Sequence, residues 1–165
     1  MLTSSRELLG FRTLAILPLV LFLPVVVSFA VAPEALWPEY IGVLFHLSVL
    51  FLVSRMDAPP WGRAAGFGWI TVDVLAGVLA INEVPSDLVL AVRLGGHVLA
   101  GVWIITVSLL ARALPVRVVG TITGLWLSAY SFVGNVFPTT VLAPASLLTL
   151  VWFALLAIMY EPQDR

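Results

Sequence analysis

The chain has 165 residues, a formal net charge of −1, and a composition that is 61% hydrophobic and only 10% charged. A soluble domain of this length could not bury so much apolar surface, so the composition indicates an integral membrane protein. The near-neutral charge gives no sign of a nucleic-acid partner. The sequence contains no cysteine and no lysine, which excludes disulfides, thiolate metal sites and a Schiff-base cofactor.

Apolar runs separated by short polar breaks predict an all-α fold, a bundle of six transmembrane helices in one domain over residues 1–165. A secretory signal peptide is an alternative for the first run, because residues 30–32 resemble a cleavage site. That run is longer than the core of a signal peptide, about 7–15 residues, and Pro33 would follow the cut. The predicted spans cover about residues 11–31, 40–55, 62–81, 88–110, 115–136 and 141–160.

Charged residues alternate between the predicted loops. Arginines occur at both termini and in the second and fourth loops, whereas the first and third loops contain acidic residues and no arginine. The positive-inside rule therefore predicts a multi-pass protein with both termini cytoplasmic (N-in, C-in) in a cell inner membrane. The many Ala, Val, Leu and Gly residues and the missing lysine are typical of a GC-rich bacterial genome. The arginines are Arg6, Arg12, Arg55, Arg63, Arg112, Arg117 and Arg165, and the acidic loop residues are Glu34, Glu39, Glu83 and Asp87.

Four ionisable side chains fall inside the predicted spans, where such groups are costly and usually face the bundle interior. Counted from the outer helix ends, Asp73 and His97 lie about 13 Å deep. On the same scale His46 lies about 10 Å deep and Arg93 about 8 Å. Arg93 and His97 are four residues apart and share a helix face, as do Glu39 and His46 at seven. The sequence therefore predicts one polar layer in the outer half of the bilayer.

An unpaired charge at this depth costs several kcal/mol, so we expect Asp73 to pair with Arg93 across the hairpin of the third and fourth spans. Such a pair is either structural or part of a polar pocket that opens outward. Ser128, Ser131 and Asn135 are expected to extend the polar layer along the fifth span. The candidate ligand-binding residues are His46, Asp73, Arg93, His97, Ser131 and Asn135.

The polar layer favours a function in binding or transporting a small anionic or amphipathic ligand. Arg93 would hold an anionic group, while Asp73 and His97 would set the protonation state. One alternative is a b-type haem protein with His46 and His97 as iron ligands, and no other metal site is predicted. Another is a non-catalytic membrane subunit of a larger complex. The sequence contains no nucleophile elbow or zinc-protease motif and does not favour an enzyme.

Small residues four apart predict close helix packing in lipid. Gly62 and Gly66 form one such pair, and Gly120 and Gly124 form another. The second pair is expected to serve either packing within the bundle or contact between two copies in a homodimer. Four further glycines make the third and fourth spans thin, for packing or for a flat ligand: Gly77, Gly95, Gly96 and Gly101.

Overall fold

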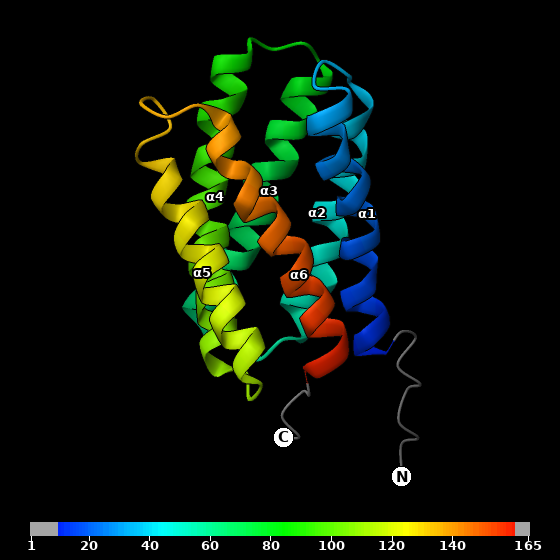
Figure 1. Ribbon diagram of the computed structural model, residues 1–165, viewed down its shortest axis with the longest axis vertical. Coiled ribbons are helices and arrows are strands. Elements are labelled where there is room, and N and C mark those ends of the chain that lie inside the picture. Colours follow the sequence, from blue (N-terminus) through cyan, green and yellow to red (C-terminus); the bar gives the residue numbers. More distant parts are fainter. Residues whose placement is uncertain (1–9, 161–165) are drawn as a thin grey trace.

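The computed structural model describes residues 10–160, and in this part of the chain it has six α-helices, one short 3₁₀ helix and no β-strand (Figure 1). Successive helices run in opposite directions, and α1 begins at the end of the bundle where α6 ends (Figure 1). The helices are α1 (Phe11–Val31), α2 (Trp37–Arg55), α3 (Pro60–Ile81), α4 (Ser86–Leu110), α5 (Leu114–Ser131), the 3₁₀ helix η1 (Thr139–Leu142) and α6 (Ala143–Met159). The predicted all-α bundle is confirmed.

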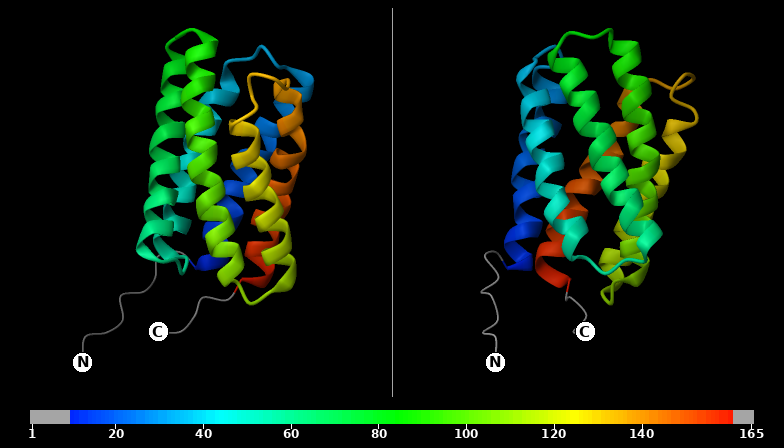
Figure 2. Two further views of the ribbon diagram at one scale, coloured as in Figure 1. Left: turned by 90° about the vertical axis from the view of Figure 1, so that its left-hand side faces the viewer. Right: turned by 180° about the vertical axis from the view of Figure 1, so that it is seen from behind.

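The six α-helices form a closed ring. Each helix packs against the next one along the chain, and α6 returns to pack against α1. The side and rear views show this order, with the hairpin of α3 and α4 along one side (Figure 2). Short connections force this up-and-down arrangement, because neighbouring antiparallel helices need only a few linking residues.

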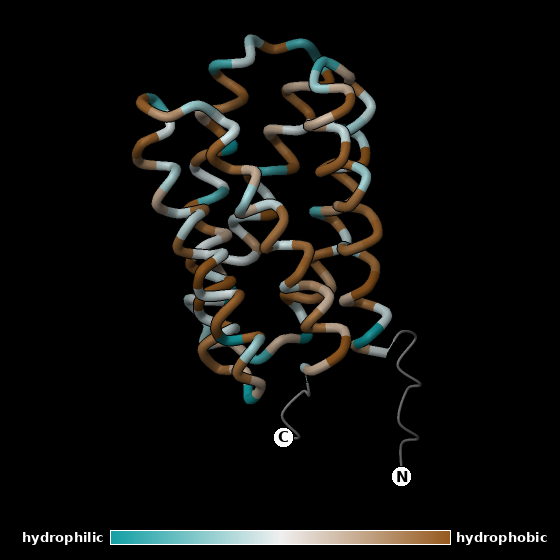
Figure 3. The backbone as a smooth tube through the Cα atoms, viewed as in Figure 1, coloured by the Kyte–Doolittle hydropathy of each residue, from teal (hydrophilic) through white to brown (hydrophobic). Residues whose placement is uncertain are grey.

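Among the described residues, five helices are long and apolar enough to cross a membrane: α1 to α4, and the segment Thr139–Met159 that joins η1 to α6. A helix of about 20 residues covers the hydrocarbon core of a bilayer, about 30 Å thick. Large apolar side chains such as Val20 and Phe29 lie exposed on the outer surface. Hydrophilic residues are concentrated near the two ends of the bundle (Figure 3). These are the properties of a multi-pass membrane protein.

The fifth helix differs from the expected span. It ends at Ser131, and residues 132–136 form turns, whereas the sequence predicted a helix to residue 136. Gly134 and Asn135 explain the early end, because both favour turns over helix interiors. Asn135 therefore lies in an exposed turn after α5, off the polar stripe predicted for it.

Aromatic side chains from several helices fill the centre of the ring. Phe45 of α2 packs against Phe153 of α6, with ring centroids 5.8 Å apart. Trp103 of α4 lies 5.6 Å from Trp69 of α3 and 5.6 Å from Trp152 of α6. These contacts tie α6 to helices that are not its neighbours in the ring, and they make the centre a packed core.

The paired glycines on α5 face the inside of the bundle. A Cβ atom at Gly120 would overlap Ser108 of α4 and Trp152 of α6. A Cβ atom at Gly124 would meet Ile105 of α4. Both surfaces are thus covered within one chain, which supports packing within the bundle, one of the two alternatives predicted for Gly120 and Gly124.

Candidate functional site

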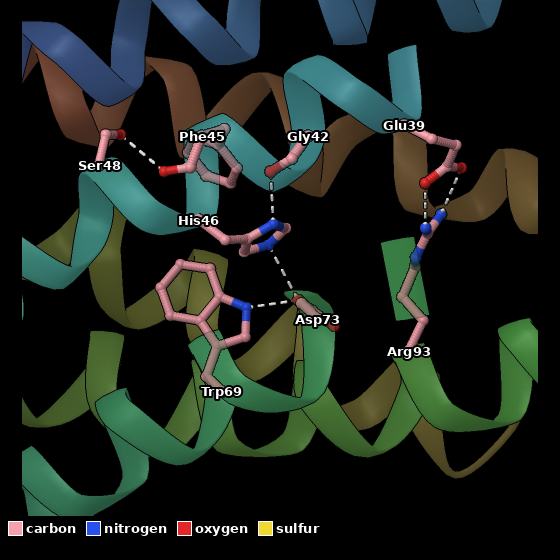
Figure 4. Close-up of polar contacts among 8 residues, drawn as sticks. All are labelled: Glu39, Gly42, Phe45, His46, Ser48, Trp69, Asp73 and Arg93. Carbon is pink, nitrogen blue, oxygen red and sulfur yellow. Dashed lines mark hydrogen bonds and ion pairs between the residues drawn. The ribbon is translucent and has the colours of Figure 1, made fainter. Parts of the chain in front are cut away.

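Asp73 is the centre of a buried polar cluster between α2, α3 and α4 (Figure 4). It lies in the middle of α3 and is only 4% exposed. Trp69, one turn earlier on α3, donates its indole N–H to Oδ2 of Asp73 at 2.5 Å. His46 of α2 places Nε2 3.1 Å from the same oxygen. The other oxygen, Oδ1, is buried and has no hydrogen-bond partner among the described residues.

His46 is fixed at both of its ring nitrogens. Its Nδ1 lies 2.7 Å from the carbonyl oxygen of Gly42, one turn earlier on α2. Its ring packs edge-on against Phe45 and Trp69, with centroids 4.7 and 5.6 Å away. Two polar contacts and two aromatic contacts therefore hold the imidazole in one orientation toward Asp73.

The α4 side of the cluster is formed by Gly96 and His97. A Cβ atom at Gly96 would overlap the Asp73 carboxylate, so glycine lets α4 approach α3 at this level. His97 interacts electrostatically with Asp73 and His46, and its Nδ1 is buried without a hydrogen-bond partner among the described residues. The structure thus brings His46, Asp73 and His97 to one level of the bundle, as the sequence predicted.

Arg93 lies one turn from His97, toward the turn that joins α3 to α4. It donates two hydrogen bonds to Glu39 in the first turn of α2, at 2.6 and 3.3 Å. The predicted pair of Asp73 with Arg93 is therefore wrong. The physical reason is reach and depth, because a long arginine side chain extends toward the wetter end of a helix. Asp73, deeper in the bundle, is instead paired with His46.

The two remaining candidates do not join the cluster. Ser131 donates its hydroxyl to the carbonyl of Leu127 on its own helix at 3.0 Å. Asn135 lies in the exposed turn after α5. Sequence reasoning missed Glu39 as the partner of Arg93 and Trp69 as a donor to Asp73. The spacing of Trp69 and Asp73 could have indicated their contact, because residues four apart share a face of a helix.

The described residues offer little for a metal or haem. No group of three or more His, Cys, Asp or Glu side chains within residues 10–160 is placed to hold a metal ion. Both nitrogens of His46 contact protein oxygens, so this arrangement leaves no nitrogen of His46 for iron. The haem hypothesis therefore gains no support from the geometry of His46.

The fold defines a multi-pass membrane bundle with a carboxylate, two imidazoles and an arginine–glutamate pair in its polar layer. Such groups can bind protons and can hold a small polar or anionic molecule. The chain matches no family model, no curated protein and no solved structure.

Proposed function

We propose that the chain crosses a bacterial inner membrane six times, with both termini in the cytoplasm. Support comes from α5, which lies between α4 and α6 in the ring and runs antiparallel to both. The charges support it too, because the bundle end where α1 begins carries arginines and the opposite end carries acidic residues. The arginines at the first end are Arg12, Arg55, Arg63, Arg112 and Arg117, and the acidic residues at the other are Glu34, Glu39, Glu83 and Asp87.

Single cysteines test this topology directly, because the natural chain contains none. A cysteine at Glu34 and one at Arg112 lie in connections at opposite ends of the bundle. In intact cells, a membrane-impermeant maleimide should label the first and not the second. The reverse labelling pattern, or labelling of both, would contradict the proposed orientation.

We further propose that this protein binds and transports a small anionic or amphipathic ligand at the level of Asp73 and His97. One observation carries this proposal. Oδ1 of Asp73 and Nδ1 of His97 are buried polar atoms without partners in the described chain. A buried polar atom without a partner costs about 1–3 kcal/mol, so such atoms in a native protein call for an occupant or a use.

The ion pair of Glu39 and Arg93 supplies the entrance to this site. Both side chains are about one-third exposed, at 26% and 30%, and they lie on the outer side of the buried cluster. When the pair separates, Arg93 presents the same two donors to an incoming carboxylate or phosphate group. The ligand therefore competes with Glu39 for Arg93. A second polar group of the ligand then binds His97, which lies one turn deeper in the bundle.

Native mass spectrometry of the purified full-length protein tests this function. We expect the wild-type protein to carry a small molecule that is lost in Arg93→Gln and retained in Arg117→Gln. Arg117 is a matched control, because it is an exposed arginine at the other end of the bundle. A wild-type protein that carries nothing under these conditions contradicts the proposal. Other chains bound at a fixed ratio would favour the subunit alternative instead.

A further inference from the structure

The hydrogen-bond partners of His46 determine which of its two ring nitrogens carries a hydrogen atom. Its Nδ1 lies 2.7 Å from the carbonyl oxygen of Gly42. A carbonyl oxygen only accepts hydrogen bonds, so Nδ1 carries a hydrogen atom. A neutral imidazole has a single N–H group, which leaves a lone pair on Nε2.

That lone pair cannot explain the contact with Asp73. Nε2 of His46 lies 3.1 Å from Oδ2 of Asp73, and an ionised carboxylate also only accepts. Two acceptors at this distance repel each other. The indole nitrogen of Trp69 reaches the same oxygen along a separate line and does not bridge His46 and Asp73 (Figure 4). The contact therefore requires one additional proton, on Nε2 as an imidazolium or on Asp73 as a carboxylic acid.

We propose that His46 and Asp73 form a binding site for one proton, and that α2 is held against α3 at this level only while the proton is bound. This inference rests on the proposed function, because it names the regulation of the same site. The protonated pair has no net charge, whereas the deprotonated pair would leave one unit of negative charge buried among membrane helices. That charge is expensive in this environment, and the two facing acceptors repel each other, so loss of the proton drives His46 and Asp73 apart.

Three further groups lie around the pair and define its electrostatic surroundings. From α2 comes Glu39, and from α4 come Arg93 and His97. Glu39 and Arg93 neutralise each other through their ion pair. His97 interacts electrostatically with both members of the pair, and its buried Nδ1 has no hydrogen-bond partner within residues 10–160. In the release step the pair gives up one proton to a base in the surrounding water, and no electron is transferred.

Side-chain NMR of the full-length protein in lipid nanodiscs tests the proton site without any ligand. The histidine rings are labelled with nitrogen-15, the aspartate carboxyls with carbon-13, and His97→Gln assigns the two imidazoles. As the pH is raised, the pair should lose one proton in a single step, after which His46 retains only its Nδ1 hydrogen. The indole N–H signal of Trp69 should shift with the same midpoint, because its acceptor is Asp73.

Asp73→Asn should abolish the shared step and the shift of the Trp69 signal. Asp87→Asn is the matched control, because it removes an exposed carboxylate outside the cluster and should change neither signal. If Asp73→Asn does not fold, His46→Gln replaces it: the Trp69 signal should then no longer shift with the pH, and a persisting shift would assign the titration to Asp73 alone. A neutral His46 beside an ionised Asp73 at every pH measured, with the two side chains still in contact, would overturn the proposal.

The result is separable from the test of ligand binding. A proton step in a protein that carries no small molecule keeps the proton site and rejects the proposed ligand. A bound ligand without any proton step keeps the proposed function and rejects the proton site. An unchanged proton step in Asp73→Asn would also reject the site, since it would assign the titration to another group.

Discussion

Arg93 donates hydrogen bonds from both terminal nitrogens to the carboxylate of Glu39, joining α4 to α2 across the end of α3. Gly77 of α3 makes room for this connection. A Cβ atom at Gly77 would collide with Val43 and approach Glu39 of α2. The two-pronged geometry restricts the relative position of the two helices more strongly than a single charge contact would.

Removing either partner should destabilise the bundle, and removing both should cost less than the sum. We expect Glu39→Gln and Arg93→Gln to show a coupling energy of about 1 kcal/mol, because the pair is bidentate but partly exposed. The coupling energy is measured by unfolding the two single variants and the double variant with increasing concentrations of a denaturing detergent. Strictly additive effects would show that the ion pair contributes nothing to the packing of α2 on α4.

Gly96 and its neighbour Gly95 provide a matched test of the close approach between α3 and α4. Gly96→Ala places a Cβ atom against the Asp73 carboxylate, whereas a Cβ atom at Gly95 meets nothing within 4 Å. We expect Gly96→Ala to destabilise the protein by about 1–3 kcal/mol through overpacking. Gly95→Ala should be neutral or stabilise it by up to about 1 kcal/mol, because alanine favours helix. Thermal unfolding of both variants measures these changes in stability. Equal changes in the two variants would contradict the placement of Asp73 against Gly96.

Apolar periodicity and length predicted the helices well because they are set by local sequence. The first span, residues 11–31, coincides with α1, because its long apolar run is interrupted by a charge only near the start, at Arg12, and is followed by Pro33 and Glu34. The fifth span was predicted too long, because Val133 and Val136 maintain the apolar character through a turn. Hydropathy does not register the preference of Gly134 and Asn135 for turn conformations.

The partners of the charged residues could not be predicted from chain adjacency. Asp73 and Arg93 lie on consecutive helices, which suggested a pair, but each faces α2. Glu39 shares a helix face with His46, and Arg93 shares one with His97. These shared faces were enough to identify the correct partners. Matching these faces by depth gives Glu39 with Arg93 near the end of the bundle and His46 with the deeper groups. Which side chains meet is decided by the rotation of each helix about its axis, and that rotation depends on tertiary packing.

Gly120 provides a test of packing inside the bundle against a homodimer. The indole of Trp152 donates to the hydroxyl of Ser108 at 2.9 Å, and a Cβ atom at Gly120 would overlap both groups. We expect Gly120→Ala to lower stability by about 1–3 kcal/mol without changing the oligomeric mass. Gly42→Ala is the control, because a Cβ atom there meets nothing within 4 Å. Loss of a dimer without loss of stability would favour the intermolecular alternative.

Tyr160 should make the stability of the protein fall at high pH. Its ring stacks on Phe11 with centroids 4.6 Å apart, and its phenol oxygen accepts a hydrogen bond from the backbone N–H of Asp57 at 3.2 Å. Burial raises the pKa of the Tyr160 phenol, with the Asp57 carboxylate acting in the same direction and the Asp57 N–H in the opposite one. The folded protein thus retains this proton more tightly than the unfolded chain, whose tyrosine pKa is about 10.

The contribution of Tyr160 is therefore fully present below about pH 10 and is lost as the pH rises through the raised pKa of the folded state. Tyr160→Phe should cost about 1 kcal/mol at neutral pH, for the lost hydrogen bond, and should flatten the fall in stability at alkaline pH. Thermal unfolding at several pH values between about 8 and 11 measures this. Tyr40→Phe, at an exposed tyrosine, should leave the fall unchanged. An equally steep fall in Tyr160→Phe would assign the alkaline transition to other groups.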